Sequence, residues 1–367
     1  MQPTVLQILP ELDCGGVERG TLDVAAELVR QNYRSIVVSG PGRLVPELIS
    51  NGSEHFKLHV GKKSIFSARL IPVLRKLFVE QHVNIVHARS RLPAWLAYLA
   101  IQNIAQESRP VFITTVHGPY SVNRYSKVMT KGKRVIAISK YIKNYIIQNY
   151  SDVDQTKIEV VHRGISKSKY PYNYKPSAQW LDAWRNEYPE LINKMIITLP
   201  ARITRWKGHN DFIEIITKAR KTGLNVHGLV AGGADAKKQG FLNELKTLIA
   251  RNNMDENFTF IGHRDDMREI MSISDVVLSL AKIPEAFGRT ALEALSLGTP
   301  VIAYDHGGAA EVLSEMFPTG KANPLDIDHV VTLLNQFSQS MPRVEDKDVF
   351  TLSNMLEKTI SIYNSTL

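Results

Sequence analysis

Two glutamates eight positions apart, Glu285 and Glu293, begin and end the stretch Glu-Ala-Phe-Gly-Arg-Thr-Ala-Leu-Glu. Because Phe287 and Gly288 interrupt this stretch and helix-forming residues follow, we expect Glu285 on a loop and Glu293 in the second turn of a helix. Free N–H groups and the helix dipole attract anions to a helix N-terminus. The stretch therefore predicts a seat for a sugar nucleotide, although a solvated helix face explains many glutamate pairs. The predicted donor-binding residues here are Phe287, Gly288, Arg289, Thr290 and Glu293.

A second group of charged residues follows the apolar run Ile196–Leu199, in the segment from Pro200 to Gly208. Arg202 and Lys207 leave this predicted strand close to a glycine, and a planar guanidinium with a mobile ammonium suits a diphosphate. The alternative is an ordinary solvated basic loop.

Glycine and histidine follow two predicted strands of the first half. Gly15 and Gly16 stand before the helical pattern of 21–28, where they would let a phosphate approach the backbone. They lack the third glycine of the dinucleotide fingerprint, and a plain tight turn is the alternative. His117 follows Val111–Val116 and either contacts a sugar hydroxyl or phosphate or is structural.

Two further strand ends in the second half are candidates for binding the base of a nucleotide. Val226–Ala231 ends at Gly232, and Phe258–Ile261 ends at Ile261. Exposed backbone at these ends would hydrogen-bond a base edge. Neither side chain discriminates one base from another.

The elements that position these residues are short β-branched runs alternating with helical patterns, which predicts an α/β fold with parallel sheets. The ten predicted strands are 5–9, 35–38, 85–87, 111–116, 135–138, 196–199, 226–231, 258–261, 276–280 and 301–303. The rhythm pauses between about 164 and 194, where glycine and prolines interrupt it. We therefore expect two Rossmann-like, doubly wound domains facing a central cleft, at 1–170 and 171–345, followed by a C-terminal helix at 346–367.

Composition narrows the class of protein. A length of 367 residues favours two domains, and the single cysteine, Cys14, excludes an internal disulfide. No apolar run is long enough for a signal peptide or a spanning helix, so we expect a cytoplasmic protein.

The net charge of +9 is unevenly distributed along the chain. Residues 1–175 hold 25 basic and 12 acidic side chains, whereas 176–367 hold 20 and 24. The first half therefore predicts an anionic partner, with membrane lipid, a phosphorylated acceptor and nucleic acid as candidates.

The order and spacing of these motifs resemble the retaining glycosyltransferases of family 4, which have the GT-B architecture of two Rossmann-like domains. The resemblance covers nearly the whole chain. It is carried by Gly15–Arg19, Thr115–Gly118, Val135–Lys140, Val161–Ile165, Arg202 with Lys207-Gly208, and Glu285–Glu293.

The resemblance implies a role for each residue of the predicted site. Glu285 would contact the transferred sugar and Glu293 the ribose hydroxyls, while Arg202 and Lys207 would hold the diphosphate. It further implies that no metal or other cofactor is obligatory, and that the final helix crosses back to the first domain. The residues predicted to act in catalysis are His117, Arg202, Lys207 and Glu285.

Two residues of this chain differ from the family pattern, and both lie on the acceptor or hinge side. Arg163 replaces the usual asparagine of the turn between the domains, and Arg89 replaces a histidine that often follows the Val-His-Ala strand of the first domain. By the same resemblance the Gly16 backbone would bind the distal phosphate, and His117 the donor sugar or phosphate. The predicted acceptor-binding residues, for a phosphorylated or lipid-linked glycan, are Arg89, Arg91, Tyr120 and Asn123.

The segment Ser64–Glu80 combines an apolar face with Arg69, Arg75 and Lys76. It would either lie on an anionic inner-membrane surface or form an ordinary core helix, which Pro72 would distort. The resemblance to family 4 implies a retaining transfer of a hexose-type sugar from a nucleotide sugar to a glycan or lipid-linked acceptor, in lipopolysaccharide or other cell-envelope synthesis. We expect the enzyme to be cytoplasmic or peripheral to the membrane. A sugar-nucleotide epimerase and a basic nucleic-acid-binding protein are the alternatives. The basic residues lack the aromatic interleaving and reading motifs of nucleic-acid binders, so we expect no nucleic-acid partner.

Overall fold

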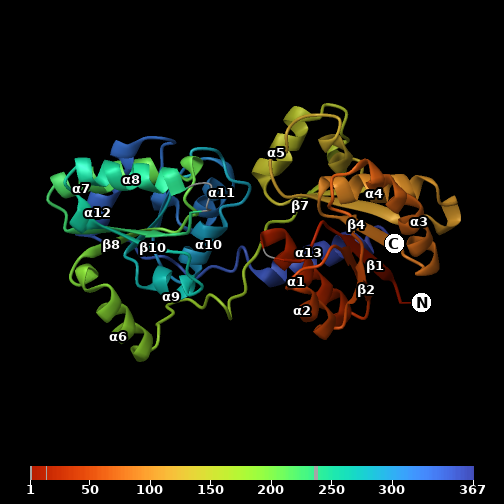
Figure 1. The fold of residues 1–367 in the computed structure, drawn as a ribbon, viewed down its shortest axis with the longest axis horizontal. Helices are drawn as coiled ribbons and strands as arrows, with labels where there is room; N and C mark the ends of the chain where they lie inside the picture. Colours follow the sequence, from red (N-terminus) through yellow and green to blue (C-terminus); the bar gives the residue numbers. More distant parts are fainter. Residues whose placement is uncertain (1, 14, 235–238) are drawn as a thin grey trace. The chain divides into compact units, whose positions relative to one another are not determined.

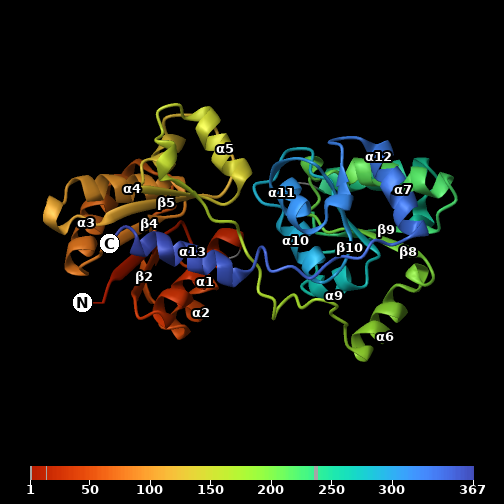
Figure 2. The same cartoon turned by 180° about the vertical axis from the view of Figure 1, so that it is seen from behind.

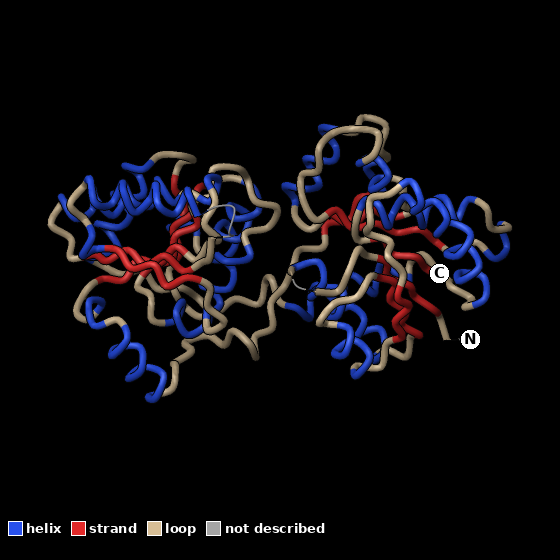
Figure 3. The backbone as a smooth tube through the Cα atoms, in the orientation of Figure 1, coloured by secondary structure: helices blue, strands red, loops and turns tan. Residues whose placement is uncertain are grey.

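The computed structural model describes residues 2–13, 15–234 and 239–367, so Cys14 lies outside the described residues. The chain forms two compact units. Unit 1 comprises 1–162 with 353–367, and unit 2 comprises 163–352. The domain boundaries predicted from the sequence, at 170 and 345, lie seven residues inside the two ends of unit 2, at 163 and 352. Figure 3 shows that each unit has strands at its centre and helices around them.

Unit 1 is built on a parallel sheet of seven strands in the order β3-β2-β1-β4-β5-β6-β7. Its central strands are almost wholly buried, as expected for a sheet covered on both faces. The strands are β1 (Thr4–Ile8), β2 (Arg34–Ser39), β3 (Glu54–Lys57), β4 (Ile85–Ala88), β5 (Val111–Val116), β6 (Arg134–Ala137) and β7 (Ile158–Val160).

Helices cover both faces of this sheet (Figures 1 and 2): α1, α2 and α13 lie on one face, and α3 and α4 on the other. The C-terminal α13 belongs to unit 1, where its Tyr363 is fully buried. The helices are α1 (Gly16–Arg30), α2 (Val45–Ser50), α3 (Leu70–Glu80), α4 (Arg91–Gln102), α5 (Lys140–Asn149) and α13 (Leu352–Asn364).

Unit 2 repeats the arrangement with a parallel sheet of six strands in the order β10-β9-β8-β11-β12-β13. Along the chain this order is 3-2-1-4-5-6, the classical doubly wound topology. The strands are β8 (Met195–Leu199), β9 (Val226–Ala231), β10 (Phe258–Gly262), β11 (Val276–Ser279), β12 (Val301–Tyr304) and β13 (Lys321–Ala322).

The helices of unit 2 also lie on both faces of its sheet. Figure 1 shows α7, α8 and α12 on one face and α9 and α10 on the other. The helices are α6 (Ala178–Glu187), α7 (His209–Lys221), α8 (Gln239–Arg251), α9 (Met267–Ser272), α10 (Arg289–Ser296), α11 (Gly307–Met316) and α12 (Ile327–Gln339).

The structure confirms the predicted α/β class with two doubly wound parallel sheets. In such sheets the strand order reverses at a switch point, and ligands bind beyond the carboxyl ends of the strands beside it. The switch point lies between β1 and β4 in unit 1 and between β8 and β11 in unit 2. The loops that follow these four strands are therefore the first place to look for a site.

The segment Ser64–Glu80 divides into a short 3-10 helix, η1 (Ile65–Arg69), and α3. Because α3 begins at Leu70, Pro72 stands in its first turn, where its missing N–H costs no intrahelical hydrogen bond. The expected distortion is thus replaced by an ordinary helix start.

Candidate active site

The loops that follow β8 and β11 pack directly against each other at the switch point of unit 2. Gly208 ends the first loop with a positive φ of 80°, and a Cβ there would lie 2.1 Å from the carbonyl oxygen of Leu280. Only glycine fits this conformation and this approach. The residue before it, Lys207, is therefore held beside the second loop.

Lys207 and Glu285 meet across these two loops. The Lys207 ammonium donates a hydrogen bond to Glu285 Oε1, and only 19% and 17% of the two side chains are exposed. The ammonium also lies 4.5 Å from the centre of the Trp206 ring. Both members of the pair line one small pocket with Thr290, beside Leu199, Pro200, Ala201 and residues 278–281.

Arg202 lies in the same loop as Lys207 and is exposed. It makes no ion pair or side-chain hydrogen bond with another described residue. Its guanidinium is therefore available to an anion at this end of the sheet.

The loop that carries Glu285 is fixed by its backbone. The Gly308 N–H donates to the Glu285 carbonyl over 2.7 Å. Gly288 caps α10 with a φ of 74°, and a Cβ there would lie 2.5 Å from Ala309 Cα. Phe287 is buried, with its ring 5.7 Å from that of Phe350. Phe287 and Gly288 thus shape the loop through packing, and the N-terminus of α10 follows immediately.

Glu293 lies in the second turn of α10, as the sequence predicts. Arg289 Nε donates to its Oε1 over 2.8 Å, and 12% of the Glu293 side chain is exposed. Burial, together with the neighbouring Glu293 charge, raises the pKa of Tyr170. Glu293 is therefore held at the helix start by a cation and a phenol.

Gly232 and Ile261 have structural partners in unit 2. A Cβ on Gly232 would lie 2.0 Å from the Ala201 carbonyl oxygen, so this glycine allows β9 to pack on the loop after β8. The Ile261 side chain packs on the cluster around Trp184. Any contact of Ile261 with a base would have to use its backbone.

In unit 1, Gly15 is the N-cap of α1 with a φ of 129°, and Gly16 is the first helical residue. The two glycines thus stand between β1 and a helix N-terminus, as predicted. His117 follows β5, and its backbone N–H donates to the Tyr120 hydroxyl over 3.4 Å.

Arg89 is buried at the carboxyl end of β4, with 3% of its surface exposed. Its Nε donates to Gln7 Oε1 over 2.7 Å, and burial lowers its pKa. The adjacent His87 lies 2.6 Å from both the Tyr363 hydroxyl and Thr115 Oγ1. Arg89 is therefore part of an internal polar network that reaches α13.

The other predicted acceptor residues surround the start of α4. The Arg91 guanidinium lies 4.9 Å from the ring centre of Tyr120 and 5.4 Å from that of Tyr125. Asn123 Oδ1 accepts a hydrogen bond from the Ser126 N–H over 2.8 Å. The structure thus brings Arg91 and Tyr120 together and gives Asn123 a turn-forming contact.

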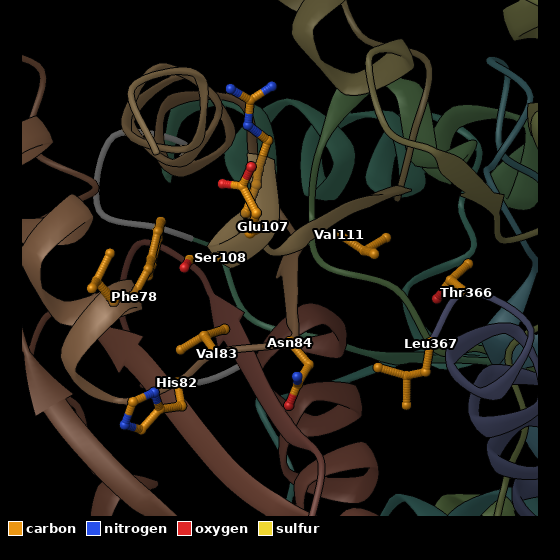
Figure 4. A pocket seen from close by; sticks show the side chains of 11 residues that line it. Phe78, His82, Val83, Asn84, Glu107, Ser108, Val111, Thr366 and Leu367 are labelled. Atoms are coloured by element: carbon orange, nitrogen blue, oxygen red, sulfur yellow. The ribbon is translucent and has the colours of Figure 1, made fainter. Parts of the chain in front are cut away.

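A larger pocket of unit 1 lies at the amino ends of the strands, next to the residues that precede β4 and β5 (Figure 4). It is lined by Phe78, Val79, His82, Val83, Asn84, Glu107, Ser108, Arg109, Val111, Thr366 and Leu367. None of the predicted site residues lines it, and it lies at the amino ends of β4 and β5, whereas the predicted residues follow the carboxyl ends of strands.

The described residues contain no group of three or more His, Cys, Asp or Glu side chains placed to hold a metal ion. No helix in these ranges has both the length and the hydrophobicity to cross a bilayer.

A buried cluster of polar side chains lies behind these loops and was not predicted from the sequence. Asp211 in α7 accepts a hydrogen bond from Tyr304 and pairs with Lys282 of the loop after β11. An aspartate in the first turn of a helix is so common that it carries no functional signal. The proximity of Lys282 to a strand end was the one available hint.

Comparison with known proteins agrees with this architecture. A model described as Glycosyltransferase Family 4 matches residues 14–169, and one described as Glycosyl transferases group 1 matches 182–340. Together they cover most of both units. The chain therefore belongs to the GT-B glycosyltransferases of the family 4 type.

Individual relatives support the same assignment. A glycosyltransferase structure from Rickettsia africae has a TM-score of 0.87 and 29% identity, over 100% of this chain and 98% of that one. Anabaena HepE, solved with UDP-glucose, has a TM-score of 0.79 and 20% identity, over 99% of each chain.

Among curated proteins, the Escherichia coli O-antigen biosynthesis glycosyltransferase WclY is 27% identical over 237 residues. This match covers 63% of the present chain and 61% of WclY. The chain thus spans about three fifths of the length of this relative and of a Bacillus subtilis relative.

Proposed function

We propose that this glycosyltransferase moves a hexose-type sugar, with retention of anomeric configuration, from a nucleoside diphosphate sugar to a glycan or lipid-linked acceptor. The observation that carries the proposal is the meeting of Lys207 and Glu285 in one pocket at the switch point, beside the N-terminus of α10. A cation for phosphate, a carboxylate for hydroxyls and a helix end for negative charge are the groups such a donor needs.

The proposed reaction breaks the bond between the anomeric carbon and the diphosphate oxygen and forms a bond from that carbon to the acceptor oxygen. Negative charge develops on the leaving diphosphate, where Lys207 and Arg202 would stabilise it. The leaving phosphate oxygen takes the proton of the acceptor hydroxyl. Glu285 orients the sugar and is assigned no role as acid or nucleophile, and no step is assigned to a metal.

Two of the related proteins suggest the class of donor and the pathway. HepE was solved with UDP-glucose, and WclY is named for O-antigen biosynthesis. By analogy we propose a nucleotide hexose as donor and a cell-envelope glycan as product. His117, Gly16 and the unit 1 residues Arg91 and Tyr120 remain our proposals for further donor and acceptor contacts.

The test incubates the purified protein with a panel of nucleotide sugars, with and without candidate acceptors, and measures nucleoside diphosphate release. Product NMR then gives the anomeric configuration. Lys207→Ala should lower turnover about 100- to 1000-fold, the usual effect of losing one transition-state charge contact, with an unchanged circular dichroism spectrum. Near wild-type turnover in the folded variant would remove the diphosphate assignment. Absence of release from every donor would contradict glycosyl transfer.

We also propose that the enzyme works at an anionic membrane surface through residues 62–80, here called the η1–α3 segment. Its Phe66 and Val73 are 60% and 45% exposed, so the segment presents large apolar side chains to solvent. Lys62 and Lys63 precede them and are exposed. Apolar side chains among cations are the pattern of interfacial segments.

A further inference from the structure

A buried carboxylate lies behind the two loops of the candidate site. Only 8% of the Asp211 side chain, in the first turn of α7, is exposed. Its Oδ2 accepts a hydrogen bond from the Tyr304 hydroxyl over 2.9 Å, and its Oδ1 lies 2.6 Å from Lys282 Nζ. Burying a charged carboxylate is unfavourable unless it is paired and hydrogen-bonded, so the three side chains depend on one another.

Lys282 connects this cluster to both loops. It lies three residues before Glu285, and its backbone N–H donates to the Trp206 carbonyl over 2.8 Å. One residue earlier, the Ala281 carbonyl oxygen lies 2.8 Å from His306 Nε2. Lys282 is thus held through its backbone by one loop and through its ammonium by α7.

The attraction between the Lys282 ammonium and Asp211 is not by itself a strong stabilising interaction. The Lys282 side chain is 39% exposed, and ion pairs with such exposure contribute little to the free energy of unfolding. The position of Lys282 distinguishes this ion pair from others, because the contacts of Lys282 with Asp211, and of Asp211 with Tyr304, fix the segment from Lys282 to Glu285 against α7 and β12. A carboxylate that must meet particular sugar hydroxyls needs such support, since small displacements are costly in catalysis.

We propose that Lys282 and Asp211 are positioning residues that hold Glu285 in the geometry required by the donor sugar. This inference rests on the proposed function, in which Glu285 contacts the transferred sugar. The Lys282 N–H bond to Trp206 does not involve the side chain. Loss of the ammonium should therefore disturb Glu285, while Lys207 stays in its own loop and its ammonium remains available to the diphosphate.

The test compares Lys282→Met and Lys282→Arg with a matched control, Lys218→Met. Lys218, in α7, likewise pairs with an aspartate, at 2.8 Å from Asp328, and its side chain is 38% exposed. Lys282→Met should lower kcat/KM for donor at least tenfold, through kcat. It should not weaken the binding of the product nucleoside diphosphate, because Lys207 keeps its ammonium when Glu285 is displaced. Lys282→Arg should recover most of the activity, and Lys218→Met should match the wild type.

Hydrogen–deuterium exchange of residues 280–288 provides a readout that needs no donor. These amides should exchange faster in Lys282→Met and remain at the wild-type rate in Lys218→Met. Unchanged exchange, or unchanged kcat/KM despite faster exchange, would overturn the inference. If the wild type transfers no sugar, the proposed function fails, and the exchange experiment still decides whether the cluster holds the loop.

Discussion

At the scale of single residues, the Lys207 ammonium has two possible partners, the Glu285 carboxylate and the diphosphate of the donor. It donates to Glu285, and the proposed reaction also needs it at the leaving diphosphate. Both side chains are mostly buried, so the carboxylate competes with an incoming phosphate for the same cation. The pair thus sets the affinity of the site for the diphosphate as well as the position of the sugar.

Glu285→Gln should therefore bind the product nucleoside diphosphate more tightly than the wild type while transferring sugar more slowly. Removing the carboxylate frees Lys207 and removes a negative charge near the phosphates. A gain of about 0.5 to 1 kcal/mol, or roughly 2- to 5-fold in Kd, is the size expected of such a pair. Isothermal titration calorimetry and kcat measure the two effects.

Glu244→Gln is the control, because Glu244 pairs with the neighbouring Arg205 at 2.7 Å on the surface. Its affinity should equal that of the wild type. Weaker diphosphate binding in Glu285→Gln would show that Glu285 supports Lys207 and does not compete with phosphate.

The residue types of this site were predictable from sequence, whereas their pairings were not. Glu285, Arg202 and Lys207 were found because charged residues follow strands that a hydrophobic pattern defines. The contact between Lys207 and Glu285 depends on how two loops 78 positions apart pack at Gly208. No local pattern contains that information.

At the scale of elements, the strands predicted from the sequence are mostly buried on both faces, and the edge strand β10 is the exception. β1 and β11 are rich in apolar, β-branched residues and were predicted. β3, β7 and β13 were missed, and each is an edge strand of its sheet. In β3, Glu54–Lys57, no residue is fully buried, so it has no apolar run to detect.

His227 in β9 makes the stability of unit 2 depend on pH. Burial, with a smaller effect of Lys194, lowers the pKa of His227 to about 4 from 6.5. Above pH 6.5 the imidazole is neutral in both folded and unfolded chains and contributes no pH dependence. As the pH falls from 6.5 to 4, only the unfolded chain takes up the proton, so the free energy of unfolding decreases.

In His227→Gln this contribution is removed. Urea unfolding between pH 7 and pH 4.5 should show a smaller loss of stability than in the wild type, by up to about 1.4 kcal/mol per pH unit. His263→Gln is the control, because 81% of the His263 side chain is exposed. Equal pH slopes in the wild type and in His227→Gln would contradict the neutral, buried state of this histidine.

At the scale of the whole molecule, charge divides along the chain between the two units. The basic excess lies in residues 1–175, and unit 2 carries the Lys207–Glu285 pocket. Length and strand count were enough to predict two doubly wound sheets. The helix α13 packs on unit 1 through a contact between His87 and Tyr363, which are 276 positions apart in the sequence. Only the family resemblance predicted that this helix returns to the first domain.

The charge of the η1–α3 segment should give salt-dependent binding to anionic liposomes. In flotation, the protein should bind phosphatidylglycerol-rich vesicles at low salt and leave them as salt screens the attraction, with no binding to phosphatidylcholine alone. Lys62→Glu/Lys63→Glu should weaken binding at least tenfold, since each cation near an anionic surface contributes about 1 kcal/mol. The matched change on α8 of unit 2, Lys246→Glu/Arg251→Glu, should have little effect. Equal losses from both double variants would assign the binding to net charge, and no binding at low salt would remove the membrane from the proposed function.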